Sequence, residues 1–270
     1  MTHPAEIAFV AIDEITLADV SGSVAVFTLA DGTLSAGAEM ADKLTGGAVS
    51  RIAGAKGYKT GNVVKLPAPG GMAADAVYVA ALGAEADEAT ARKTGAALGK
   101  AVGKGAVTIV GAGDAAAQAE IAFGYVLRTY NFDVYKTSDK DEGEDTTEND
   151  VTFASDKAEA VAALSAPMAA LAEGIYFTRD LVNEPANVLT TEDFAARLAA
   201  MGELGLEVDI LGEAEMRELG MDALLAVGMA SDDECKLVVM KWNGGGDEAP
   251  PPLPAAASVK SRPPWPLSEC

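Results

Sequence analysis

The chain has 270 residues, of which 49% are apolar and 23% charged, as in globular proteins with a hydrophobic core. Its length allows one large domain or two of ordinary size. The formal net charge of −21 argues against binding to nucleic acid or to an anionic membrane surface, because both partners require a basic face.

The cysteines and the N-terminal sequence indicate in which cellular compartment the protein is expected. Cys235 and Cys270 stand outside any CxxC motif, which is typical of a protein in a reducing compartment. The first Lys or Arg is Lys43, so the sequence predicts no secretory signal. We find no apolar run that approaches the roughly 18 residues of a membrane span. These observations predict a cytoplasmic protein.

The first half of the chain alternates short apolar runs with alanine-rich segments. We predict helices between residues 83 and 105, where acidic residues come early and Lys100 and Lys104 late, and over residues 115–129. Strands separated by helices of this length predict an α/β fold with a mainly parallel, helix-flanked sheet. The predicted strands are residues 7–12, 24–29, 62–66, 76–82 and 106–110.

An acidic segment, DKDEGEDTTEND, covers residues 139–150. A calcium-binding EF-hand loop needs glycine at its sixth position. Counted from Asp139, the glycine falls fifth, at Gly143, and Glu144 is sixth. We therefore interpret the segment as a solvated loop between domains.

An apolar stripe follows, with spacings of three and four residues, which predicts a helix. We expect residues 156–182 to form a connecting helix, in which Pro167 introduces a kink or starts a second helix. The stripe consists of Val161, Leu164, Met168, Leu171 and Ile175.

A second domain then begins. Thr190 and Asp193 form a T-x-x-D capping box at the start of a helix that Gly202 and Gly205 end. Residues 206–211 are a predicted strand, and residues 213–219 a short helix stopped by Gly220. The nearly continuous apolar run at residues 236–242 predicts a buried parallel strand.

Several kinds of site are excluded by composition. The single histidine is His3, near the N-terminus, so neither a Cys–His nucleophile pair nor a tetrahedral zinc site is expected. The turn VGAGDA, residues 110–115, matches half of a dinucleotide fingerprint, with Ala116 at the place of the third glycine. We favour a plain strand-to-helix turn, with a weak phosphate-binding turn as the alternative.

Residues 178–246 resemble the leucyl aminopeptidase family of cytosolic two-metal exopeptidases. The resemblance rests on TRDLVNEPANVLT (178–190), EVDILGEAEMRELGMDALLAVGMAS (207–231) and LVVMKWNGG (237–245). Residues 1–155 look like the smaller N-terminal domain of this family, which resembles macro domains in fold. The resemblance divides the chain into this domain, the connecting helix at 156–182, the truncated start of a catalytic domain at 183–248, and a proline-rich tail at 249–270.

The resemblance implies an activity and its requirements. Family members remove N-terminal amino acids from peptides with two divalent cations, manganese or zinc, and assemble as homo-hexamers, largely through the catalytic domain. Paired metals lower the pKa of a bridging water and stabilise the developing oxyanion.

The family motifs that supply the metal ligands, G-K-G-x-x-F-D-[ST]-G-G and N-T-D-A-E-G-R, do not occur in this chain. Lys104 lies in a similar G-K-G, but Thr108 to Val110 follow where F-D-T is required, and we assign it no metal role. We therefore expect no catalytic and no metal-binding residue, no bound cation and no activity in this chain. The substrate-binding residues are unknown, and the hexamer is in doubt.

The composition of the tail suggests how these motifs came to be missing. Seven of the 12 prolines lie in residues 250–266, and the only acidic residue after Pro251 is Glu269. Our hypothesis is a reading-frame change or truncation just after residues 246–251. The rival is a divergent, shortened homologue with a disordered proline-rich end. As an alternative function, the N-terminal domain is a non-enzymatic module that binds a nucleotide-like ligand or partner subunits.

Overall fold

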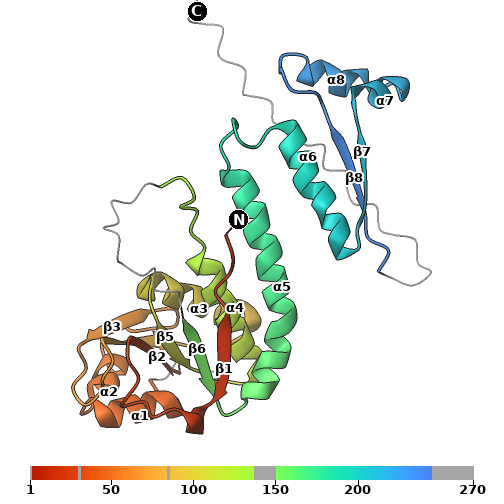
Figure 1. Cartoon of the computed structure of the whole chain (residues 1–270). Coiled ribbons are helices and arrows are strands. Elements are labelled where there is room, and N and C mark those ends of the chain that lie inside the picture. Colours follow the sequence, from red (N-terminus) through yellow and green to blue (C-terminus); the bar gives the residue numbers. More distant parts are fainter. Residues whose placement is uncertain (1, 30–31, 84–85, 137–149, 245–270) are drawn as a thin grey trace, which may run out of the picture. The chain divides into compact units, whose positions relative to one another are not determined.

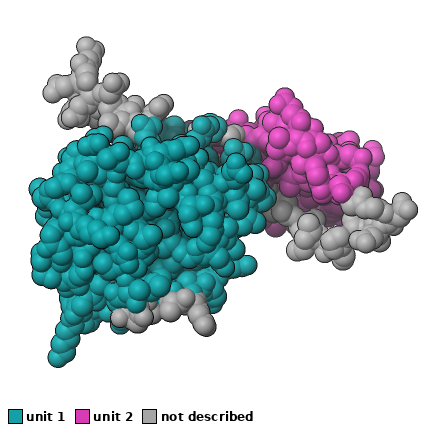
Figure 2. All heavy atoms as spheres, turned by 90° about the horizontal axis from the view of Figure 1, so that it is seen from below, with its two compact units in different colours: residues 1–180 teal, residues 181–270 magenta. Residues whose placement is uncertain are grey.

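The computed structural model describes residues 2–29, 32–83, 86–136 and 150–244. The acidic segment, apart from Asp150, and the proline-rich tail lie outside these residues. The chain divides into two compact units, residues 1–180 and 181–270, which Figure 2 shows in different colours.

Unit 1 is built on a six-stranded sheet with the order β1-β6-β5-β2-β4-β3 (Figure 1). Every neighbouring pair is parallel except β3 and β4, which confirms the mainly parallel α/β sheet. Five strands lie within one residue of their predicted bounds, and β6 was not predicted. The strands are β1 Ile7–Ala11, β2 Ser23–Thr28, β3 Val63–Pro67, β4 Ala76–Ala81, β5 Val107–Val110 and β6 Val151–Ser155.

Helices cover both faces of this sheet. Alternate residues of a strand point to opposite faces. In β2, Val24 packs with the cluster that includes Ala38 and Ala41, whereas Phe27 packs with the cluster that includes Leu98 and Tyr125. Thus α1 and α2 cover one face, and α3 and α4 the other. The helices are α1 Ala36–Leu44, α2 Ala48–Ala53, α3 Glu88–Val102 and α4 Ala115–Thr129.

The two predicted helices of this half are confirmed, and their packing is unusually close. Arg92 on α3 forms a bidentate ion pair with the buried Glu120 on α4, at 2.6 and 2.7 Å. A Cβ atom placed on Gly95 would lie 2.0 Å from the carbonyl oxygen of Ile121, and one on Gly124 would lie 2.0 Å from that of Arg92. Glycine therefore allows the two helix backbones to touch.

The connecting helix is α5, Ala158–Asn183, with Pro167 inside it. The expectation that Pro167 starts a second helix is wrong, since one helix of 26 residues continues through it. The helix α5 is also longer and more apolar than the expectation of no membrane-length apolar run allows. By length and composition alone α5 could span a membrane, with a mean hydropathy of 1.4 over 18 residues. Its buried Ala172 packs against Phe123 and Val126 of α4.

Unit 2 is smaller, with a core formed by Met216, Leu225, Cys235 and Leu237. The predicted helix at 213–219 and both predicted strands are present, but β7 and β8 pair antiparallel. The expectation that residues 236–242 form a buried parallel strand is therefore wrong; Met240 and Trp242 are exposed. The elements are α6 Thr191–Ala199, a 3-10 turn Ala200–Leu204, β7 Glu207–Leu211, α7 Glu213–Glu218, α8 Asp222–Gly228 and β8 Leu237–Lys241.

Candidate functional site

The segment TRDLVNEPANVLT begins in the last turns of α5. The Arg179 Nη1 atom donates to the carbonyl oxygen of Leu127 at 2.7 Å, and the guanidinium carbon lies 5.3 Å from the centre of the Tyr130 ring. A backbone hydrogen bond and a cation–π contact together fix a side chain in one orientation. Arg179 therefore fastens α5 to the end of α4.

Asp180 is buried, with 2% of its surface exposed. Its carboxylate accepts hydrogen bonds from the Thr2 backbone nitrogen at 2.6 Å, the Thr2 hydroxyl at 2.8 Å and the Tyr130 hydroxyl at 3.0 Å. Burial by itself would raise the pKa of Asp180, but these hydrogen bonds outweigh it and hold the pKa below its ordinary value. The residue anchors the N-terminal segment rather than facing open substrate space.

The remaining residues of this motif lie at the start of unit 2. The largely buried Glu184 carboxylate lies 3.4 Å from both Nη atoms of Arg197 on α6. Thr190 and Asp193 form the predicted capping box, in which each side chain bonds the backbone nitrogen of the other residue. These contacts start and orient α6. In the described residues the family motif thus acts as a set of structural anchors.

The described residues do not offer a metal site. No three His, Cys, Asp or Glu side chains gather closely enough within residues 2–29, 32–83, 86–136 and 150–244. A two-metal centre needs several oxygen ligands converging on cations about 3.5–4 Å apart. The donors present do not fit such a centre, so no catalytic step through metal is assigned to this part of the chain.

The glycine-rich turn at residues 110–115 connects β5 to α4. The Asp114 carboxylate accepts a hydrogen bond from the Ala117 backbone nitrogen at 2.8 Å and caps the helix. A bound phosphate would use these same first-turn N–H groups. The Lys157 Nζ atom donates to the Gly113 carbonyl oxygen at 3.2 Å, which ties the turn to the start of α5. These contacts support a plain strand-to-helix turn.

A polar cavity of about 890 Å³ lies at the amino ends of β1, β5 and β6. Its wall includes three basic side chains, Lys100, Lys104 and Arg128, together with the exposed His3. Lys104 forms an exposed ion pair with Asp133 at 3.6 Å. Basic side chains near helix C-termini also complement the helix dipole, which accounts for part of this cluster.

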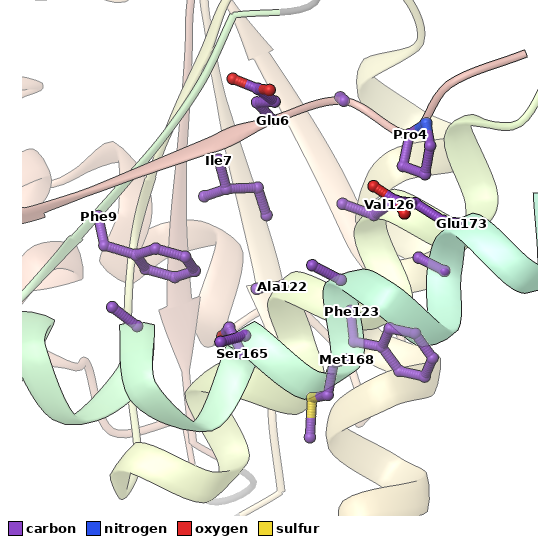
Figure 3. A pocket seen from close by; sticks show the side chains of 15 residues that line it. Pro4, Glu6, Ile7, Phe9, Ala122, Phe123, Val126, Ser165, Met168 and Glu173 are labelled. Atoms are coloured by element: carbon purple, nitrogen blue, oxygen red, sulfur yellow. The ribbon is translucent and has the colours of Figure 1, made fainter. Parts of the chain in front are cut away.

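A second, mainly apolar pocket of about 310 Å³ lies between β1, α4 and α5 (Figure 3). The pocket contains Ser165, whose Oγ atom is buried and has no hydrogen-bond partner in the described part of the chain. Sequence reasoning missed this pocket. The available signal was the alanine-rich face of α5, since small side chains at helical spacing leave space against a neighbouring element.

The N-terminal domain model of the cytosol aminopeptidase family matches residues 24–139, and the catalytic domain model of the same family matches residues 176–253. The chain belongs to the cytosol aminopeptidase family. It contains the N-terminal domain and part of the catalytic domain of that family.

Bacterial relatives of this family cover nearly the whole chain. It is 48% identical over 254 residues to the probable cytosol aminopeptidase of Cereibacter sphaeroides, and the match covers 93% of this chain and 51% of the relative. The probable cytosol aminopeptidase of Dinoroseobacter shibae is 46% identical over 253 residues, with the same two coverages. The chain therefore spans about half the length of these relatives.

Two solved structures superpose on the fold of this chain. A tomato leucine aminopeptidase mutant superposes with a TM-score of 0.67 at 18% identity, over 88% of this chain and 50% of that one, which shows the fold alone. The bottromycin maturation enzyme BotP superposes with a TM-score of 0.58 at 27% identity, over 81% of this chain and 45% of that one.

Proposed function

We propose that this chain carries the N-terminal domain and the first part of the catalytic domain of a leucyl-type aminopeptidase, a cytoplasmic enzyme that releases N-terminal amino acids from peptides. The observation that carries the proposal is the 48% identity along 93% of the chain to a probable cytosol aminopeptidase. The two domain matches also follow one another in the family's order.

The intact enzyme uses two divalent cations, manganese or zinc, to activate a water molecule and polarise the scissile carbonyl. A solved BotP structure is described as a complex with manganese, which supports this choice of metal. The metal-ligand motifs belong to the half of the family sequence that the chain does not span. We expect the chain as given to be inactive and to bind no catalytic metal, and its assembly into the family's hexamer is in doubt.

A direct test compares the chain with a repaired fusion. Residues 1–246 are joined to the remaining C-terminal half of the Cereibacter sphaeroides relative. We expect the 270-residue chain to leave leucine p-nitroanilide unhydrolysed with Mn²⁺ or Zn²⁺. The fusion should hydrolyse it, and a chelator should stop the reaction. A folded, hexameric but inert fusion would refute the proposed function, and a metal-dependent activity of the 270-residue chain would refute its inactivity.

The frame-change hypothesis for the tail has its own test. The gene is resequenced from codon 230 to several hundred bases past codon 270 and translated in three frames. We expect another frame to continue with the Lys-bearing F-D-T-G-G and the N-T-D-A-E-G-R motifs. A gene in which no frame contains them would favour the divergent, shortened homologue.

A second candidate is a macro-like binding module in unit 1. Its support is weaker, because open α/β sheets bind nucleotides beyond the carboxyl ends of their strands. The polar cavity lies at the amino ends instead. At the carboxyl end of β5, the Asp114 carboxylate already caps α4. Calorimetry with ADP-ribose should give no heat of binding, and saturable heat would establish the module.

A further inference from the structure

One face of the β7–β8 sheet in unit 2 is polar toward its outer end. Residues opposite one another in an antiparallel pair share a face, and successive residues alternate between faces. Glu207 lies opposite Lys241, and Asp209 shares their face. The Lys241 Nζ atom forms an ion pair with Asp209 at 3.2 Å, and the Asn243 amide donates to Glu207 at 3.0 Å. Charged and amide side chains therefore occupy this end of the face.

The opposite face of the same sheet is apolar along both strands. Ile210 lies opposite Val238, and Val208 lies opposite Met240. Val238 is buried, whereas Ile210 and Met240 are 38% and 42% exposed. Just beyond the strand, Trp242 is 62% exposed. An apolar sheet face is stable in water when a second layer covers it, so the exposed part of this face indicates a missing layer.

The helix α6 covers only one end of the apolar face. It runs beside β7 and β8, and its Ala195 and Leu198 are buried (Figure 1). Lys236, two residues before Val238 and thus on the same side, forms an ion pair with Glu192 of α6 at 3.7 Å. The helix therefore lies over the Val238 end. We call the remaining part, formed by Val208, Ile210 and Met240, the open face.

The edges of this sheet are also available. In the described part of unit 2, β7 and β8 pair only with one another, so the outer edge of each strand can accept a further strand. An isolated pair of strands is marginally stable in water, and three or more strands or a packed layer are needed for independent stability. The sheet of unit 2 therefore requires additional polypeptide along its edges and over its open face.

The length of the relatives indicates what this polypeptide is. The catalytic domain model of the family matches residues 176–253, and the chain spans 51% of the Cereibacter sphaeroides relative. The relative thus has about as much sequence again, which belongs to the domain that unit 2 begins. A second copy of this chain fits the face less well, because two copies with a formal charge of −21 each repel one another.

We propose that the open face and the free edges of β7 and β8 bind the second half of a cytosol aminopeptidase catalytic domain when that half is supplied as a separate chain. The inference rests on the proposed function, since the partner is the remaining part of the same catalytic domain. The partner contributes an apolar layer over Ile210 and Met240 and a strand that pairs with a free edge. Backbone pairing of this kind gives affinity, and the apolar layer gives specificity.

The test co-expresses the tagged 270-residue chain with the part of the Cereibacter sphaeroides relative that follows its match to this chain. We expect the two polypeptides to copurify in equal amounts, also at high salt, because apolar contacts are not screened. In the complex, backbone hydrogen exchange over residues 207–211 and 237–241 should slow by about 10-fold or more relative to the chain alone. A partner half that stays insoluble or fails to copurify, or unchanged exchange in these strands, would overturn the proposal.

Variants locate the contact on the open face. The double variant Ile210→Glu, Met240→Glu places two carboxylates there, and we expect the copurified amount of partner to fall about 10-fold or more. Val64→Glu is the matched control, because Val64 is 37% exposed and lies on β3, an edge strand of unit 1. Equal copurification by the double variant and the control would place the contact elsewhere and refute the proposal.

Other occupants of the open face give different results. A dimer of the chain alone that Ile210→Glu dissociates would identify a second copy. Binding of the partner half by residues 1–246, but not by the 270-residue chain, would identify residues 247–270. Either result would overturn the proposal. Copurification without metal-dependent activity would support the docking and count against the proposed function. An active fusion whose halves do not associate as separate chains would count against the docking alone.

Discussion

The contact between α3 and α4 predicts that Gly95→Ala destabilises unit 1, although alanine is the better helix former. An alanine at this position gains about 1 kcal/mol of helix propensity. Its Cβ atom, however, would lie 2.0 Å from the carbonyl oxygen of Ile121, and the atom it meets is backbone rather than a flexible side chain. The helices must separate to admit it.

The magnitude follows from these two effects. Overpacking a well-packed interior costs about 1–3 kcal/mol, and a clash with backbone belongs at the upper end of that range. After the gain in propensity is subtracted, we expect a net loss of about 2 kcal/mol in the free energy of unfolding. For a unit of this size, such a loss lowers Tm by about 4–8 °C.

The assay can report on unit 1 alone. All six tyrosines precede residue 181, and both tryptophans follow it. Tyrosine absorbance during urea unfolding therefore follows unit 1. Gly174→Ala on α5 is the matched control, since its Cβ atom would meet nothing within 4 Å, and we expect it to stabilise by up to about 1 kcal/mol. Equal stability of the two variants would show that α3 and α4 do not touch at Gly95.

Three further predictions concern buried polar groups and the stability of the two units. Burial raises the pKa of Tyr125 to about 12, and its hydroxyl has no hydrogen-bond partner in the described chain, so Tyr125→Phe should be neutral or stabilising. The control, Tyr176→Phe, should lose about 1 kcal/mol in urea unfolding, because its hydroxyl donates to a backbone carbonyl at 2.6 Å; the reverse order of stabilities would contradict the assignment. Because its folded pKa is lowered, Asp180 contributes stability that is present above its ordinary pKa of 3.8 and lost as the pH falls through the lowered value. Asp180→Asn should therefore cost about 1–3 kcal/mol at pH 7 and flatten the acid limb of a stability–pH curve; an unchanged acid limb would exclude this role. Limited proteolysis should cut residues 180–270 before residues 1–155, and equal protection of both regions would refute the expectation.

The strands that could be predicted are those with a clear apolar signal. Residues 76–82 are almost entirely apolar and gave β4 to within one residue, since all six of its residues are buried. The strand β6, VTFAS, was missed because it has five residues, three of them Thr, Ser or Ala, and follows directly on the acidic segment. Tertiary pairing with β1 and β5 makes it a strand.

Short helices were equally hard to predict. Of the six residues of α2 only Val49 is buried, and the helix starts after Gly47, a glycine with φ of +82°. A single buried position cannot produce the hydrophobic periodicity from which a helix is predicted. By contrast, the Thr190 capping box was found because a cap is a local interaction between side chain and backbone, encoded by two residues three positions apart.

The residues of a strand do not by themselves determine whether it pairs parallel or antiparallel with its neighbour. The apolar run at 236–242 correctly predicts β8, but an apolar run reports burial and not whether the partner strand is parallel. In the described part of unit 2, β8 pairs antiparallel with β7, and its far end, with Met240, is exposed. The same limit applies to the apolar pocket, which is lined by β1, α4 and α5 and has no signature within any one of them.

The motif TRDLVNEPANVLT identifies the family through structural contacts and not through reacting groups. Arg179 and Asp180 belong to the most specific stretch of the resemblance, yet their side chains contact the α4 carbonyl of Leu127, Thr2 and Tyr130. Such contacts constrain a sequence as strongly as catalysis does, because a buried charge that loses its partners costs several kcal/mol. A motif of this kind identifies the family through its structural anchors. It therefore supports membership of the chain in the family without placing any step of a reaction on these residues.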